Sequence, residues 1–221
     1  MIMEEILFDP SKRFSSESLP AFIEHLDRQM ADDNLYSLDN NIAILKLFLL
    51  YPKCNDVSVC EKILIKALTR IPQPDFDVCL FQLPLSVKRD PSISSIVNLY
   101  NLLQDCKFND FWAALKKTNF AMNKGVITGA RNFALEVISL AYHKISIADF
   151  IILLDLENEK VAEKLAIEQN WQVANKFIQI NSNLDTKGSK SSQIDKHMRP
   201  ESIKHCLTLL DSIGKIPGIR K

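Results

Sequence analysis

The chain has 221 residues, of which 47% are hydrophobic and 24% charged, enough to bury a core without disulfide or metal staples. Basic and acidic residues are equal at 27 each, so the whole chain has no net charge to attract nucleic acid or an anionic membrane. Only 5 glycines occur and few segments alternate apolar with polar residues, which favours a mainly α fold. No apolar run approaches the roughly 20 residues that span a bilayer, and the first residues are acidic, unlike a secretory signal. We therefore expect a cytoplasmic protein without membrane contact.

The charge is unevenly distributed along the chain. From Asp185 onward there are eight basic and four acidic side chains, which leaves this tail at +4 and the preceding residues at −4. Cysteines are odd in number and scattered, so they predict buried thiols in a reducing compartment; they are Cys54, Cys60, Cys79, Cys106 and Cys206.

The first half of the chain predicts a series of packed helices. Apolar residues at helical spacing indicate an amphipathic helix over 20–30. The next stretch, 38–51, is apolar on nearly every side, so as a helix it has to be enclosed by neighbours; Ser37 is suited to cap it and Pro52 to end it.

Further helices follow after short turns that contain proline. A capping box from Ser58 to Glu61 predicts one helix, and Asp90 before Pro91 predicts another. A shorter helix is expected over 76–83, and Phe108, Phe111 and Trp112 have the spacing of a core face. These segments predict an irregular, HEAT-like helical-repeat domain over residues 1–125.

The remaining chain predicts a second domain and a tail. Gly125 and Gly129 suggest a boundary, after which three helices and one strand within 171–180 follow in the order of a winged helix, over 126–182. Residues 183–221 are expected to form a mobile basic linker and a C-terminal amphipathic helix over 200–213.

Three segments together resemble a known family. They are Tyr36-Ser-Leu-Asp-Asn-Asn-Ile-Ala-Ile-Leu-Lys-Leu, Ile63-Leu-Ile-Lys-Ala-Leu-Thr, and Leu102-Leu-Gln-Asp-Cys-Lys-Phe-Asn-Asp-Phe-Trp. Their order and spacing resemble the subunit k family of eukaryotic translation initiation factor 3, with weaker similarity continuing through 133–171. The resemblance implies a helical-repeat domain fused to a winged helix, which is a PCI-type module. It also implies a non-catalytic scaffold subunit that pairs with subunit l in a complex that binds the small ribosomal subunit.

From this reading we predict protein-docking residues at two places. One is the winged-helix edge and the other the apolar face of the last helix; the residues are Phe177, Ile178, Ile180, Ile203, Leu207 and Leu210. Two alternatives stay open at this point. The first is a related small PCI subunit of the proteasome regulatory-particle lid or of the signalosome. The second is a nucleic-acid-binding winged-helix protein.

No catalytic, cofactor or metal site is predicted. The four histidines and five cysteines lack the spacing of a zinc site, and no phosphate-binding loop or nucleophile motif is present in the sequence. The expected third helix of the winged helix, 158–169, has more acidic than basic side chains, which disfavours a duplex-binding role. Direct RNA contact is therefore open only for the basic tail.

Overall fold

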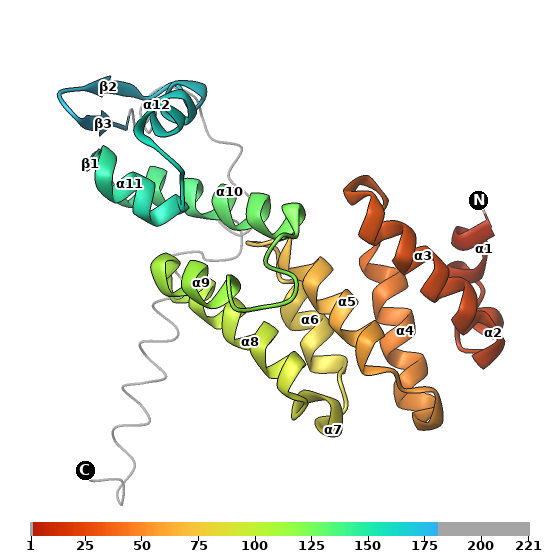
Figure 1. Ribbon diagram of the computed structural model, residues 1–221. Coiled ribbons are helices and arrows are strands. Elements are labelled where there is room, and N and C mark those ends of the chain that lie inside the picture. Colours follow the sequence, from red (N-terminus) through yellow and green to blue (C-terminus); the bar gives the residue numbers. More distant parts are fainter. Residues whose placement is uncertain (1, 181–221) are drawn as a thin grey trace, which may run out of the picture. The chain divides into compact units, whose positions relative to one another are not determined.

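The computed structural model describes residues 2–180, a mainly helical fold that ends in a small antiparallel sheet (Figure 1). The expected mainly α class is confirmed, and the described residues lie within one compact unit, Met1–Asn181. The helices of the first 115 residues are α1 (Ile2–Phe8), α2 (Pro10–Arg13), α3 (Leu19–Ala31), α4 (Leu38–Leu50), α5 (Val57–Leu68), α6 (Asp75–Gln82), α7 (Leu85–Lys88), α8 (Pro91–Gln104) and α9 (Phe108–Leu115). The predicted helix over 200–213, and with it Cys206, lies outside the described residues.

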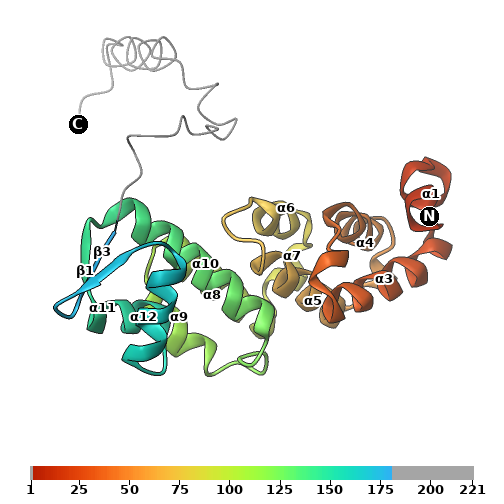
Figure 2. The same ribbon diagram turned by 90° about the horizontal axis from the view of Figure 1, so that it is seen from above.

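Successive helices pack against one another in pairs. Helix α3 packs on α4, α5 on α6 and α8 on α9, while α4 also contacts α6 and α5 contacts α8. Figures 1 and 2 show α4 and α6 side by side in one layer, with α3 and α5 in the layer in front of them. The predicted apolar helix over 38–51 is α4, and the residues along its middle are buried, as its composition requires.

A buried network of side-chain amides joins α3 to α4. The amides of Gln29 and Asn41 pair reciprocally at 3.2 and 3.3 Å, and Gln29 Oε1 also accepts from the backbone N–H of Ser37 at 3.1 Å. Asn40 Nδ2 donates to the carbonyl of Phe22 at 3.2 Å. Because an unpaired buried amide is costly, this network allows only one register between the two helices.

Two predictions about α5 and α9 have different outcomes. The cap of α5 is Asp56, whose carboxylate accepts from Ser58 N at 2.8 Å, so the predicted capping box at Ser58 is wrong by two residues. On α9, by contrast, Phe108, Phe111 and Trp112 are buried and form the expected core face. Asp is as good a cap as Ser, so the pattern from Ser58 to Glu61 did not by itself identify the first residue of the helix.

The two glycines that suggested a domain boundary lie inside α10 (Lys124–Ala141), near its N-terminus. A Cβ at Gly129 would lie 2.6 Å from the backbone oxygen of Thr69, at the C-cap of α5. Glycine is therefore needed here for a close approach of two helices. At Gly125 the nearest atom would be Thr69 Cγ2 at 3.2 Å, a side-chain contact that a shift of a few tenths of an ångström would relieve. The boundary at 125/126 stays a prediction.

The rest of the described chain builds a three-stranded sheet on two short helices. The elements are β1 (Lys144–Ser146), α11 (Ile147–Leu154), α12 (Glu159–Glu168), β2 (Gln172–Ala174) and β3 (Phe177–Gln179). The sheet order is β1-β3-β2 and both pairings are antiparallel. The single strand expected within 171–180 is a hairpin, because Asn175 and Lys176 both adopt positive φ (51° and 64°) as in a type I′ turn.

We predict that Gly129→Ala destabilises the protein by about 1–3 kcal/mol, because the new methyl group would collide with the Thr69 carbonyl. Urea denaturation followed by circular dichroism measures the change.

Gly125→Ala is the matched control. Its methyl group meets no backbone atom among its nearest neighbours, only side-chain atoms of Thr69, Asn123 and Asp33 at 3.2–3.4 Å, and alanine favours a helix over glycine by about 0.5–1 kcal/mol, so we expect a smaller loss than for Gly129→Ala. Equal effects of the two substitutions would contradict the proposed contact.

Candidate functional site

The predicted docking residues of the winged-helix edge lie on and beside β3, but they do not form one surface. Phe177 is 40% exposed, whereas Ile178 and Ile180 are 0% and 4% exposed. The predicted set is therefore corrected: Ile178 and Ile180 are core residues, and Phe177 alone of these three presents its side chain to solvent. The remaining predicted residues, Ile203, Leu207 and Leu210, lie outside the described residues.

The position of β3 in the sheet also corrects the expected edge. Strand β3 lies between β1 and β2 and pairs with both, so its backbone has no free side. The pairing with β1 extends one step further, since Ile180 N donates to His143 O at 3.0 Å. Within residues 2–180, the outer edges of the sheet belong to β1 and β2 and pair with no other strand, so their outward backbone groups are suited to a further strand.

The two faces of the sheet have opposite characters. Ile145, Ile178 and Val173 are cross-strand neighbours and face the core, where Phe150 and Trp171 pack edge to face with ring centroids 6.0 Å apart. Alternation then places Phe177 on the outer face, together with Ser146 and Ala174 opposite it. This outer face with its two open edges is the candidate docking surface, which we call the sheet surface.

Lys144 supports the exposed aromatic ring on the sheet surface. Its Nζ lies 4.1 Å from the ring centroid of Phe177, within cation–π range. Lys144 cannot be singled out from the sequence, because β1 has only three residues and is too short to produce a periodic pattern. A ring that is partly exposed and oriented by a cation is an anchor that needs little ordering on binding.

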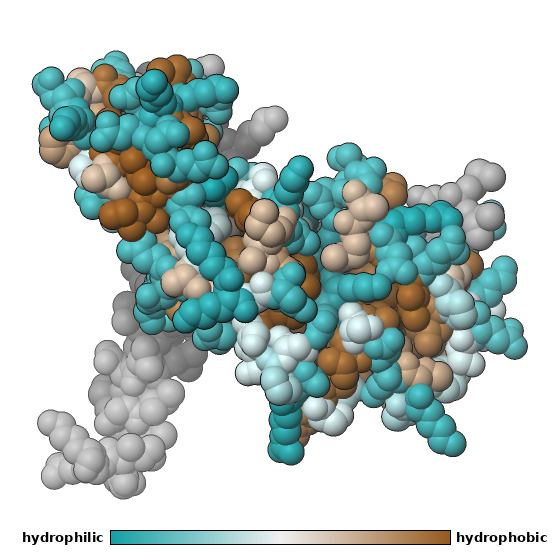
Figure 3. Space-filling model, viewed as in Figure 1, coloured by the Kyte–Doolittle hydropathy of each residue, from teal (hydrophilic) through white to brown (hydrophobic). Residues whose placement is uncertain are grey.

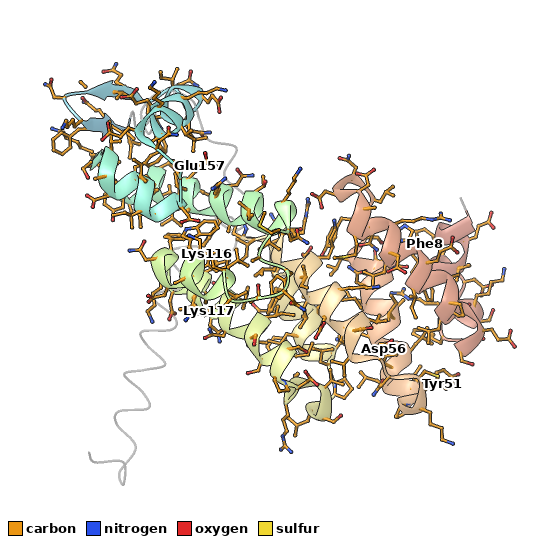
Figure 4. The ribbon with its side chains drawn as sticks, viewed as in Figure 1. Phe8, Tyr51, Asp56, Lys116, Lys117 and Glu157 are labelled. Carbon is orange, nitrogen blue, oxygen red and sulfur yellow. The ribbon has the colours of Figure 1, made fainter. Side chains whose placement is uncertain are left out.

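A junction of α9, α10 and α11 holds the sheet surface in place. Trp112 Nε1 donates to the Leu153 carbonyl at 2.9 Å, and Arg131 donates to the carbonyls of Leu154 and Asp155 at 3.0 and 2.8 Å. These are the free carbonyls at the C-terminus of α11, where a cation is favoured. Asp155 adopts a left-handed conformation as the cap, and Lys116 pairs with its carboxylate at 2.7 Å. Figure 4 shows Lys116, the C-cap residue of α9, near this junction.

The charges of α12 oppose nucleic-acid recognition. Lys160 and Lys164 are exposed on this helix, but so are Glu159, Glu163 and Glu168, and Lys164 lies 3.9 Å from Glu168. A helix that enters a groove has to approach phosphates with a net positive surface. The acidic excess on α12 would repel them.

We searched residues 2–180 for a metal site, a groove with catalytic side chains and a membrane-spanning helix. Within residues 2–180 there is no cluster of three or more His, Cys, Asp or Glu side chains arranged for a metal ion. An open groove of about 650 Å³ lies between α8 and α9, and its lining includes Ser94, Asn98 and Lys117 but no histidine or cysteine. Among the described helices, none is long and apolar enough to cross a membrane.

The thiols divide into two classes, so the expectation of uniformly buried cysteines is only partly right. Cys60 and Cys79 are buried, and burial, reinforced by Asp56 and Asp75 respectively, raises the pKa of each thiol to about 12. Cys54 and Cys106 are exposed.

A family profile and individual proteins that are similar to this chain belong to the same family. The profile of the CSN8/PSMD8/EIF3K family matches residues 55–191. Eukaryotic translation initiation factor 3 subunit K of Culex quinquefasciatus is 29% identical over 181 residues, covering 80% of this chain and 81% of that protein. The proteins of the same name from Danio rerio and Homo sapiens are 32% and 34% identical, over 60% of this chain and 61% and 62% of theirs.

We predict that Ile178→Ala lowers stability by about 2–4 kcal/mol, because it leaves a cavity between the sheet and its helices. Phe177→Ala removes only a half-exposed ring and should cost less than about 1 kcal/mol. Thermal and urea unfolding of the two variants measures the difference, and a larger loss for Phe177→Ala would contradict the assigned faces.

The thiol classes predict selective labelling at pH 8. In a Cys206→Ser background, Cys54 and Cys106 should react rapidly with an aromatic disulfide reagent, while Cys60 and Cys79 react only on unfolding. Cys60 and Cys79 react slowly in the folded protein because the thiolate is the reactive form, and the raised pKa keeps both buried thiols protonated until about pH 12. Peptide mapping identifies the labelled positions, and fast labelling of Cys60 in the folded protein would contradict its burial.

Proposed function

The chain belongs to the CSN8/PSMD8/EIF3K family, and from this premise we propose that it is a non-catalytic scaffold subunit of eukaryotic translation initiation factor 3. The names of its relatives support the choice of complex, because the three proteins compared above are all subunit K of that factor. The role is that of a cytoplasmic assembly component which acts on the small ribosomal subunit through the complex.

The proposed architecture is a PCI-type module. Helices α3 to α9 are assigned to a HEAT-like repeat domain (1–125), and α10 to β3 to a winged helix (126–182), followed by a linker and C-terminal helix (183–221). Pairwise helix packing supports the first assignment. The second is supported by three helices combined with an antiparallel sheet whose last two strands form a hairpin.

The proposed mechanism is docking of a partner subunit, subunit l above all, on the sheet surface. One observation carries this proposal: Phe177 is exposed on the central strand of the sheet, beside the hairpin turn, and the Nζ of Lys144 lies over its ring. A partner strand would add to β1 or β2 by backbone hydrogen bonds, and its side chains would cover the ring. The last helix, with Ile203, Leu207 and Leu210, is proposed as a second docking element.

Rigid support makes the sheet surface suitable for such docking. Arg131 and Trp112 bind the end of α11, which leads directly from β1, so the sheet is tied to α9 and α10. A partner would therefore meet a preorganised surface and lose less entropy on binding. This supports a scaffold in which one subunit sets the position of the next.

Two alternatives give different partners. A small PCI subunit of the proteasome lid or the signalosome is consistent with the family profile, which includes members of several names. A nucleic-acid-binding winged helix is disfavoured by the acidic excess on α12. The relatives that share the name of an initiation factor subunit favour the first proposal over both.

Native purification of the tagged full chain, followed by mass spectrometry, tests the proposal. Initiation factor 3 subunits should co-purify, and Phe177→Ala should lower the recovery of the directly bound subunit several-fold. Recovery of lid or signalosome subunits instead would overturn the choice of complex.

Ile167→Ala is the matched control, because Ile167 is 65% exposed on α12 and lies outside the sheet. It should leave recovery unchanged. Binding of the purified chain to RNA with a steep dependence on salt would favour the nucleic-acid alternative.

A further inference from the structure

A second exposed surface lies at the end of the helical array where α4 and α6 finish. Leu49 and Leu50 end α4 with exposed fractions of 47% and 57%. Phe81, near the end of α6, and Leu85, at the start of α7, are 76% and 66% exposed. Isolated exposed leucines are ordinary, but four large apolar side chains on neighbouring elements form a patch of the kind found at interaction sites.

The arrangement of the helices brings these side chains to one end. Helices α4 and α6 pack together, and their N-terminal ends are joined by the hydrogen bond from Tyr36 OH to Asp75 at 2.7 Å. The two helices therefore run in the same direction, and their C-terminal ends lie at the same end of the array (Figures 1 and 2). Figure 4 places Tyr51, the residue after α4, at this end.

Basic residues gather in the segments that carry the patch. The segments 42–55 and 78–89 contain four basic residues and no Asp or Glu, although the chain before Asp185 has a net charge of −4, and Asp56, Asp77 and Asp90 directly flank these segments. The basic residues are Lys46, Lys53, Lys88 and Arg89. Within residues 2–180, no side-chain hydrogen bond or ion pair holds any of these four.

The carboxylates that flank these segments in the sequence are already bound within the chain. Asp56 and Asp90 cap α5 and α8, and Asp77 accepts a hydrogen bond from Tyr100 OH at 2.6 Å. Hydrogen bonds from neighbouring serine residues lower the pKa of Asp56 and Asp90, so both remain ionised and committed to capping. The four cations are therefore available to an external anion.

We infer that this basic-apolar surface (Leu49, Leu50, Phe81 and Leu85 with Lys46, Lys53, Lys88 and Arg89) binds an acidic amphipathic helix of a partner protein. Apolar residues at i, i+3, i+4 and i+7 would cover the leucines and Phe81, and Asp or Glu beside them would meet the cations. A protein segment fits better than RNA, because three of the four apolar side chains are aliphatic and cannot stack on bases.

This surface is separate from the sheet surface. It lies on α4, α6 and α7, while the sheet surface follows α10 in the chain. A scaffold with two such surfaces contacts two different segments of its assembly. The inference concerns the partner's chemistry and does not require that the assembly be the initiation factor.

Carbodiimide cross-linking of the natively purified complex tests the inference, because the reagent joins a lysine amine directly to a carboxylate in contact with it. Lys46, Lys53 and Lys88 should be joined to Asp or Glu residues of one partner segment with helical apolar spacing. In the Phe81→Ala, Leu85→Ala double variant, the yield of these cross-links should fall at least tenfold.

A second double variant, Leu140→Ala with Ile167→Ala, removes equally exposed apolar side chains elsewhere and should leave the yield unchanged. Circular dichroism checks that both variants fold. Three results would overturn the inference: cross-links from these lysines no more frequent than from Lys117, an unchanged yield in the first variant, or ultraviolet cross-links from Phe81 to RNA instead. Recovery of initiation factor subunits in the same sample is scored separately, so a failure of the proposed function is distinguishable.

Discussion

The two halves of the described chain approach closely where α10 meets α5 at Gly129. There is no room for a Cβ beside the Thr69 carbonyl, so the backbones of the two elements meet directly. Nearby, the buried Lys66 of α5 forms an ion pair with Asp33, which precedes α4. The position of α10 is thus set by the C-terminal end of α5, and every later element is placed relative to α10.

From this contact the placement of the sheet surface follows in two steps. Arg131, on the same helix as Gly129, binds the last carbonyls of α11, and Trp112 of α9 binds the carbonyl before them. Helix α11 follows β1 without an intervening residue, so orienting the helix orients the strand. Figure 3 shows one face of the protein, and on the part that contains the sheet hydrophobic residues lie beside polar ones at the surface. The proposed scaffold role requires such fixed positions of helices and strands, because a displaced docking surface would displace the subunit bound to it.

Local patterns in the sequence were enough to predict most of the helices, but not α1, α2 and α7, and not the sheet. The nearly continuous apolar composition indicated α4, and apolar residues at helical spacing indicated the core face of α9. Strands of three residues carry no such pattern, so β1 was missed and β2 was merged with β3. The sheet order is a long-range property, and without it β3 could not be recognised as the central strand of the sheet.

The glycines of α10 illustrate the same limit. In sequence, Gly125 and Gly129 are indistinguishable from a flexible link, and only the position of Thr69 explains why one of them is required. Likewise Arg131 and Lys144 were two cations among 27 basic residues until the carbonyls of α11 and the ring of Phe177 were placed beside them.

The central claim is that a partner subunit docks on the sheet surface. Hydrogen exchange of the backbone amides, compared between the free chain and the assembled complex, tests it most directly. The amides on the open edges of β1 and β2 should exchange at least tenfold more slowly in the complex, while β3, already paired on both sides, should change little. Unchanged exchange at both edges in a complex that contains the chain would contradict docking at this surface.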